Sequence, residues 1–178
     1  MKQKQSNIKG FVIIIAGIIA GIALDQYTKW LAVKHLKDQD AYTIIEGVFS
    51  LQYLENKGAA FGLMQNQKIL FVIGSIIIVL LVAFCFWKMP RIKRFIPLYT
   101  TGTCILIGAF GNFIDRLRLG YVVDFFYFEL INFPIFNVAD IFITVPFVVL
   151  ALLILFYYKE EELSWLSLHQ KTSDKIEE

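Results

Sequence analysis

Residues 133–158, FPIFNVADIFITVPFVVLALLILFYY, decide the fold class of this chain. From Val138 onward the stretch is long and apolar enough to cross the hydrocarbon core of a bilayer, which takes roughly 20 mainly apolar residues. Its beginning nevertheless carries Asn137 and Asp140, polar groups that cost free energy inside a membrane. A spanning helix with polar side chains gathered at one end predicts a site at the membrane boundary.

The rest of the chain has the same character. Its 178 residues are 57% hydrophobic, and the mean hydropathy is +0.62, well above that of an ordinary soluble domain. Four stretches qualify as spans: residues 11–31, 69–87, 96–113 and 138–158. We therefore expect an all-α integral membrane protein with four transmembrane helices. Residues 1–158 would form one membrane-embedded domain, followed by a polar tail over residues 159–178.

Basic residues set the expected orientation. Lysines precede the first span, and the link between the second and third spans has four basic residues and no acid: Lys88, Arg91, Lys93 and Arg94. By the positive-inside rule both segments face the cytoplasm, so four spans place the N- and C-termini there. A cleavable signal peptide is disfavoured because the first apolar run is followed by LDQYTKW rather than a small-residue cleavage site.

Two segments would then face outward, residues 32–68 and 117–137. Within the first, GVFSLQYLEN alternates hydrophobic and polar residues and is rich in β-branched and aromatic types. We expect a small extracytoplasmic β-rich loop between helices 1 and 2, lying on the membrane surface.

Polar residues gather at the outer end of every predicted span. Helical spacing puts Asp25 on the same face as Lys29, and Asn112 on the same face as Asp115. Polar groups with unrelated structural roles would be expected on both sides of the membrane. Because these groups all lie on the same predicted side, the sequence predicts a site between the helices at the outer boundary.

Each pairing also has a structural interpretation, which the sequence leaves open. Asn137 and Asp140 fit a helix N-cap with its third residue. Asp115 has basic neighbours, chiefly Arg116, that could neutralise it in a salt bridge. Asp25 and Lys29 could be an ion pair that anchors a helix end.

Asp124, in GYVVDFFYFEL, stands among valines and aromatics with no basic neighbour. Apolar surroundings raise a carboxyl pKa, whereas a helix N-terminus favours the carboxylate, so Asp124 and Asp140 would titrate differently. Two such carboxyls can activate a water, one as base and one protonating or hydrogen-bonding a substrate carbonyl. We expect Asp124 to be the more protonated partner.

The sequence offers no alternative chemistry in a suitable place. Two cysteines and two histidines are too few for a disulfide framework or a zinc site. We expect no metal and no cofactor. The net charge of +2 gives no indication of nucleic-acid binding.

Five motifs together carry a resemblance. LDQYTKW, NKGAAFG, GAFGNFIDR, VVDFF and FNVAD, in this order and on one predicted membrane face, resemble the bacterial lipoprotein signal peptidases, or type II signal peptidases. The resemblance covers residues 11–158. One departure is Ile107, where many members carry a second glycine before Gly108.

The resemblance implies an intramembrane aspartic endopeptidase of the bacterial cell membrane with its active site near the extracytoplasmic face. The implied substrates are diacylglyceryl-modified prolipoproteins, cut on the N-terminal side of the lipidated cysteine. Membrane lipids and peptide inhibitors such as globomycin are implied partners. Asp124 and Asp140 match the catalytic pair. The supporting or substrate-binding positions matched are Asp25, Lys29, Asn56, Gly58, Asn112, Asp115, Arg116 and Asn137.

Two other classes of membrane protein agree less well with the sequence. A proton-coupled transporter predicts ionisable groups near the bilayer midplane and often inverted repeats, neither of which the sequence shows. A purely structural membrane protein would leave Asp124 unexplained. The sequence therefore favours the peptidase. It does not indicate substrate preference or oligomeric state.

Overall fold

The computed structural model describes residues 2–58 and 67–166, with side chains from Gly10 onward. In this part of the chain the long helices are α1 (Lys2–Leu36), α2 (Lys68–Lys88), α3 (Ile96–Arg118) and α4 (Val138–Leu152). The strands are β1 (Tyr42–Ile45), β2 (Phe49–Asn56) and β3 (Val122–Phe128). Shorter helical segments are η2 (Lys93–Phe95), η3 (Glu129–Ile131), η4 (Leu153–Tyr157) and η5 (Glu160–Leu166).

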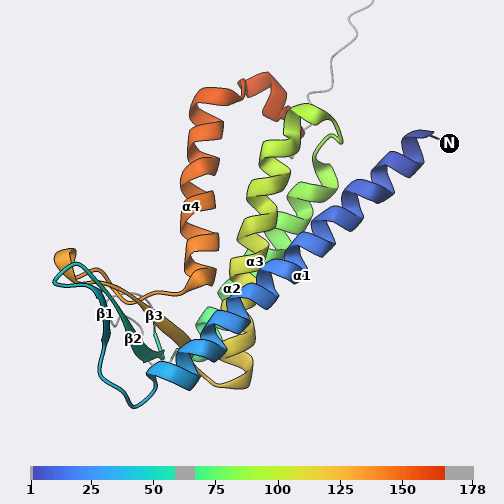
Figure 1. The fold of residues 1–178 in the computed structure, drawn as a ribbon. Coiled ribbons are helices and arrows are strands. Elements are labelled where there is room, and N and C mark those ends of the chain that lie inside the picture. The colour runs from blue at the N-terminus through green and yellow to red at the C-terminus, as the bar shows by residue number, and fades with distance from the viewer. Residues whose placement is uncertain (1, 59–66, 167–178) are drawn as a thin grey trace, which may run out of the picture.

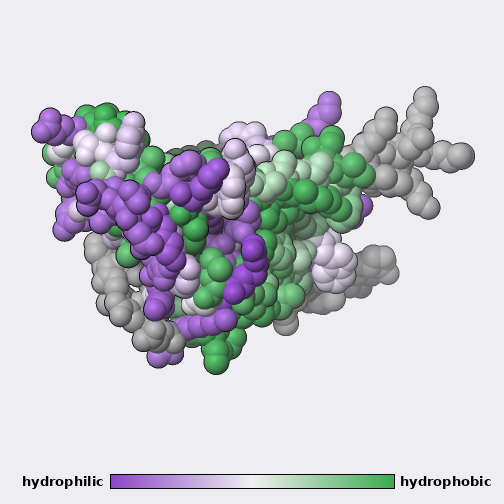
Figure 2. Space-filling model, turned by 60° about the horizontal axis from the view of Figure 1, so that its bottom comes forward, coloured by the Kyte–Doolittle hydropathy of each residue, from purple (hydrophilic) through white to green (hydrophobic). Residues whose placement is uncertain are grey.

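The long helices form a bundle, and the sheet projects sideways from one end of it (Figure 1). We call this the sheet end. The beginning of α1 and the segment η5 both lie at the opposite end. Hydrophilic residues are concentrated at the sheet end, while the sides of the helices are mostly hydrophobic (Figure 2). This distribution suits a protein whose helices face lipid and whose sheet end faces water.

By length and composition, three helices among the described residues can cross a membrane: Gly10–Leu36, Lys68–Lys88 and Val138–Tyr157. The third predicted span, residues 96–113, falls in α3, which is not among them. Nearly half of the residues of α3 are buried, and it packs against each of the other three long helices. A helix surrounded by protein can carry more polar residues than one that faces lipid, so its composition follows from its central position.

Close packing around α3 depends on small residues. A β-carbon added at Gly111 would lie 2.5 Å from Asp25 Oδ2 and 3.0 Å from the Ala139 β-carbon. Such distances are too short for real atoms, so glycine lets α1 and α4 approach α3 here. Gly21 of α1 similarly makes room for the side chain of Ile107, the position that departs from the family pattern.

The three strands form one antiparallel sheet in the order β1-β2-β3. The predicted strand or hairpin between helices 1 and 2 is confirmed as β1 and β2. The prediction confined the β structure to this loop, which is wrong, because β3 comes from the segment after α3. In the β2–β3 register Leu54 pairs with Asp124, so this third strand places Asp124 in the sheet.

The opposite end of the bundle is closed by aromatic packing. Phe95 and Tyr158 stack with centroids 5.5 Å apart, and Trp165 of η5 packs edge-on against Phe95 at 6.1 Å. Arg94 bonds Glu162 through Nε at 2.7 Å. The sequence predicted only a polar tail after residue 158, and residues 167–178 of that tail lie outside the described residues. Its first part instead packs on the link between α2 and α3.

Candidate active site

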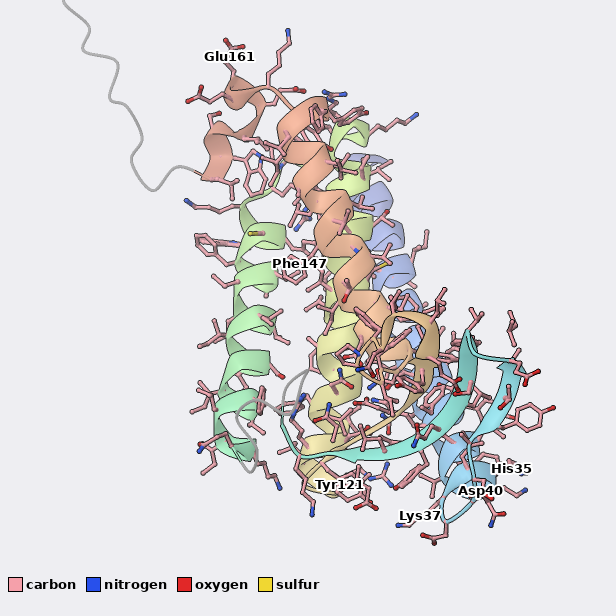
Figure 3. All side chains as sticks on the ribbon, turned by 90° about the vertical axis from the view of Figure 1, so that its left-hand side faces the viewer. His35, Lys37, Asp40, Tyr121, Phe147 and Glu161 are labelled. Carbon is pink, nitrogen blue, oxygen red and sulfur yellow. The ribbon has the colours of Figure 1, made fainter. Side chains whose placement is uncertain are left out.

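Nitrogen- and oxygen-bearing side chains gather where α3, the beginning of α4 and the sheet meet (Figure 3). The labelled residues His35 and Tyr121 mark this end of the molecule, and Glu161 marks the opposite end. The polar groups at this junction form one connected network that extends from α1 to β2.

A buried ion cluster ties α1 to its neighbours. Lys29 Nζ lies 3.0 Å from Asp25 Oδ2, one helical turn away, and 2.9 Å from Asp115 Oδ2 of α3. All three side chains are at most 4% exposed. The backbone N–H of Ala139 in α4 donates to Asp25 Oδ1 at 2.9 Å. Gln26 donates to Asp115 Oδ1, also at 2.9 Å. The Asp25–Lys29 ion pair therefore holds three helices together rather than one helix end.

Asp115 is neutralised by a different residue from the one expected. The sequence suggested its neighbour Arg116, but the ion-pair partner is Lys29. Consecutive helical residues point in different directions, so Arg116 cannot follow a carboxylate that faces α1. Its guanidinium lies 4.8 Å from the Phe71 ring centroid, a cation–π distance. Asp115 is thus engaged as expected, although by a lysine from another helix.

Asn112 connects the ion cluster to Asp140. Its Oδ1 accepts a hydrogen bond from Lys29 Nζ at 2.9 Å, and its Nδ2 donates to Asp140 Oδ1 at 2.8 Å. Because an ammonium group has no acceptor, the amide must present its oxygen to Lys29. Its nitrogen is then directed at the carboxylate.

Asn137 combines two roles that the sequence left as alternatives. It is the N-cap of α4, in a capping box in which its Oδ1 accepts from Asp140 N and its N–H donates to Asp140 Oδ2, both at 3.0 Å. Its Nδ2 also donates to Asp124 Oδ1 and, at 3.1 Å, to Asn112 Oδ1. The capping interpretation is correct, and the same side chain joins Asp124 to the start of α4.

Asp124 is buried in β3 with 1% exposure. Its Oδ2 accepts from Asn56 Nδ2 at 2.8 Å, and Asn56 Oδ1 accepts from the N–H of Gly58 at 2.9 Å. Among the described residues no lysine or arginine forms an ion pair with it. Burial, and after it the charge of Asp140, raise the pKa of Asp124 to about 7, against the opposing effect of the hydrogen bonds from Asn56 and Asn137.

The three asparagines share one arrangement. The oxygen of each accepts from a group that can only donate: the Lys29 ammonium or a backbone N–H. The nitrogen of each is thereby turned toward Asp124 or Asp140. Four donors therefore meet the four oxygens of these two carboxyls, counting the N–H of Asn137. Such a site can hold two carboxyls close together, with one protonated near neutral pH.

Nine of the ten predicted site residues are joined in this hydrogen-bonded network: Asp25, Lys29, Asn56, Gly58, Asn112, Asp115, Asp124, Asn137 and Asp140. Arg116 stands beside the network, where its charge interacts with those of Asp140, Asp124 and Asp115. The structure thus brings together residues from both predicted outward-facing segments and from the outer ends of the predicted spans.

Sequence reasoning missed Gln26, which also donates to Asp25 Oδ2 and to the Gly111 carbonyl, both at 3.2 Å. Its position beside Asp25 and three residues before Lys29 was the available signal. Residues 59–62 of the NKGAAFG motif lie outside the described residues. Among the described residues, no group of three or more His, Cys, Asp or Glu side chains is placed to hold a metal ion.

The model of the signal peptidase II family matches residues 12–156 of this chain. The chain belongs to the signal peptidase II family. A lipoprotein signal peptidase of Caldanaerobacter subterraneus subsp. tengcongensis is 42% identical over 147 residues, which cover 82% of this chain and 95% of that protein. The enzyme of the same name from Streptococcus thermophilus is 43% identical over 150 residues, covering 84% and 95%.

Solved structures give the same result at the level of the fold. Two structures, each described as a bacterial membrane enzyme, match with a TM-score of 0.69. They are 26% and 28% identical in sequence, covering 89% and 82% of this chain and 93% and 94% of their own lengths. Signal peptidase II is a protease family that processes prolipoproteins, so the transporter and purely structural interpretations are set aside.

Proposed function

We propose that this chain is an intramembrane aspartic endopeptidase that removes the signal peptide from diacylglyceryl-modified prolipoproteins. It would cut on the N-terminal side of the lipidated cysteine, with Asp124 and Asp140 as a metal-free catalytic pair. One observation carries the proposal: two carboxyls from different elements, β3 and α4, are both hydrogen-bonded to Asn137. One of the two also has its pKa raised to about 7.

The position of Asp140 at a helix N-terminus and the raised pKa of Asp124 suggest different roles for the two carboxyls. Asp140, at the N-terminus of α4, is the carboxylate that takes a proton from water as the water oxygen attacks the scissile carbonyl carbon. Asp124, which keeps its proton near neutral pH, donates it to the carbonyl oxygen. The tetrahedral intermediate then expels its amine, which leaves with the proton held by Asp140. As the carbonyl re-forms, one hydroxyl of the intermediate returns its proton to Asp124, so both carboxyls regain their starting states. No step needs a nucleophilic side chain.

The remaining residues position these two carboxyls. Asn112 and Asn137 hold Asp140 and Asp124 respectively, and Asn56 holds the second oxygen of Asp124. The ion cluster of Asp25, Lys29 and Asp115 fixes α1 against α3 and orients Asn112. Preorganised groups of this kind lower the barrier because they need not rearrange during the reaction.

The proposal includes a topology. All four long helices would cross the bacterial cell membrane, with both termini in the cytoplasm and the sheet end outside. A lipid-anchored cysteine holds its peptide bond at the membrane surface, which is where this arrangement puts the two carboxyls. Association within the bilayer removes much of the entropy cost of bringing substrate to site. Membrane lipids would surround the helices, and cyclic peptides such as globomycin would compete for the site.

Purified protein in detergent tests this function. We expect it to cleave a diacylglyceryl-modified prolipoprotein, and mass spectrometry should find the new N-terminus at the lipidated cysteine. The same prolipoprotein without its lipid is the matched control and should remain uncut. Activity should survive a chelator. Cleavage elsewhere, equal cleavage of the unmodified protein, or inhibition by the chelator would contradict the proposal.

A further inference from the structure

Five phenylalanines form a continuous surface that begins next to the two carboxyls. We call it the phenylalanine surface: Phe49, Phe126, Phe128, Phe133 and Phe136. Phe49 contacts Phe126 and Phe128, with ring centroids 6.1 and 4.9 Å apart. Phe136 contacts Phe126, Phe128 and Phe133 at 5.6 to 5.8 Å. Every ring therefore touches at least one other ring of the set.

This surface is attached to the site on both sides. Phe126 follows Asp124 by two residues in β3, and alternate residues of a strand share a face. Phe136 directly precedes Asn137, and its backbone pairs with Phe126 through hydrogen bonds of 2.8 and 3.0 Å. The surface is thus held in a fixed position relative to both carboxyls.

The far part of the surface is open. Phe128 is 40% exposed and Phe133 is 45% exposed, and the adjoining Leu130 and Ile131 of η3 are 70% and 68% exposed. From Asp124 to Phe128 the strand extends about 13 Å. A contiguous apolar patch of this kind marks a place where another apolar molecule binds. The phenylalanine surface lies on the sheet, which projects sideways beyond the beginning of α4 (Figure 1).

We propose that the phenylalanine surface binds the acyl chains of the diacylglyceryl group on the substrate. This inference rests on the proposed function. The lipidated cysteine is the residue next to the bond that is cut, so its acyl chains must start within about one residue of the two carboxyls. The phenylalanine surface starts at that point and leads away from it. The enzyme would then select lipidated substrates by direct contact, beyond the effect of confining them to the membrane.

Chain-length dependence tests the contact. The ratio of kcat/KM for a dipalmitoyl to a dioctanoyl substrate is measured for the wild type and for Phe128→Ala/Phe133→Ala, whose exposed side chains are not needed to fill a core. The matched control is Phe156→Ala, an aromatic residue that is 81% exposed in η4, at the opposite end of the bundle. Each methylene buried on a protein surface is worth up to about fourfold in affinity. We expect the double variant to lower the ratio at least about tenfold, and Phe156→Ala to leave it unchanged.

The inference would be overturned if the wild type and the double variant had the same ratio of kcat/KM for the two substrates. This includes the case in which the double variant loses kcat/KM equally on both substrates, because such a loss indicates a role in folding or membrane placement. A second measurement does not depend on cleavage. A lipidated peptide with a photoreactive acyl terminus should label residues 126–136, and labelling confined to α2 would overturn the inference. Labelling of residues 126–136 by a protein that does not cleave the substrate would refute the proposed function but support the contact between these residues and the acyl chains.

Discussion

The two ends of the helix bundle hold their charged groups in opposite ways. At the sheet end, Lys29 pairs with Asp25 and Asp115, and these side chains are at most 4% exposed. At the opposite end, Arg94 pairs with Glu162, with side chains 35% and 29% exposed. Moving ions out of water costs several kcal/mol each, and an exposed pair avoids most of that cost.

The sheet end therefore contains an arrangement that is less favourable for stability than that of the opposite end. The opposite end is closed by stacked aromatic rings around Phe95 and needs no buried ion. The sheet end buries three charged groups although hydrophobic residues of similar volume often stabilise a protein equally well or better. What the ions provide at the sheet end is orientation, because Lys29 dictates how Asn112 faces Asp140.

The largest expected effect comes from removing the only cation of the buried cluster. Lys29→Met leaves Asp25 and Asp115 without their shared ion-pair partner, and breaking a buried pair in this way costs about 3–5 kcal/mol. We expect the variant to lose its thermal transition or to show a much lower Tm in detergent. Lys34→Met, an exposed lysine on the same helix, is the control. Equal Tm values for the two variants would show that the cluster contributes little.

A change at the cap separates stability from catalysis. Asn137→Ser keeps a good N-cap for α4 and removes the donor to Asp124, whereas Asn137→Ala removes both. The lost cap costs about 1 kcal/mol, so the serine variant should have the higher Tm. Both variants should lose about 100-fold or more in kcat, because the two carboxyls lose their bridge. Recovery of activity in the serine variant would mean that Asn137 acts only as a cap.

The pH dependence of activity follows from the raised pKa of Asp124. The protonated form persists up to about pH 7 and is needed as the acid, so kcat/KM should fall about tenfold per unit above that pH. The bond from Asn56 lowers this pKa, so Asn56→Ala should move the descending limb to higher pH. Gln52→Ala, an exposed change on the same strand, is the control.

The raised pKa of Asp124 also predicts that the stability of the protein depends on pH. Because the pKa is raised on folding, the contribution of Asp124 is greatest below its ordinary value of 3.8 and is lost as the pH rises through about 7. The Tm in detergent should therefore decrease across this window in the wild type, and this decrease should be absent from Asp124→Asn. An identical pH profile of Tm in both proteins would contradict the raised pKa.

The smallest effect is expected at the opposite end. Arg94→Gln removes the partly exposed pair with Glu162 and the guanidinium contacts with Tyr157 and Tyr158, but leaves the packing of Phe95 against Tyr158 and Trp165 in place. Cleavage activity should be unchanged, and the Tm should change little. Phe95→Ala, which deletes the central ring, should lower the Tm much further. A large loss from Arg94→Gln alone would mean that the ion pair, and not the aromatic packing, closes this end.

Much of the fold was predictable because the hydropathy of a segment indicates directly whether it can lie in the hydrocarbon core of a bilayer. The helices lie close to the predicted spans, and the polar residues at their ends do meet. The composition of α3 shows the limit, since a helix packed against three others need not look like a lipid-facing span. Strand β3 was missed because VVDFFYF is nearly all apolar and has no alternation to distinguish a strand from a buried helical segment.

The partners within the site were harder to predict than its members. Asp124 stood out because it had no basic neighbour in the sequence, and among the described residues no lysine or arginine forms an ion pair with it. Asp115 was assigned to the adjacent Arg116, yet its partner Lys29 comes from a helix 86 positions earlier in the chain. The spacing of residues in the sequence predicts which side chains are neighbours along one helix, but it does not predict which side chains meet between helices. Gln26 was overlooked although its spacing from Lys29 along one helix was visible in the sequence, because its bond to Asp115 of another helix was not.

The most direct test of the account compares three aspartates of the network. Cleavage of a diacylglyceryl-modified prolipoprotein is measured for Asp124→Asn, Asp140→Asn and Asp115→Asn, with the Tm of each recorded. We predict that the first two variants stay folded and lose at least about 10⁴-fold in activity. Asp115→Asn should lose stability, and any folded fraction should remain active. Substantial activity in Asp124→Asn, together with a folded but inactive Asp115→Asn, would contradict the Asp124–Asp140 pair and assign catalysis to Asp115.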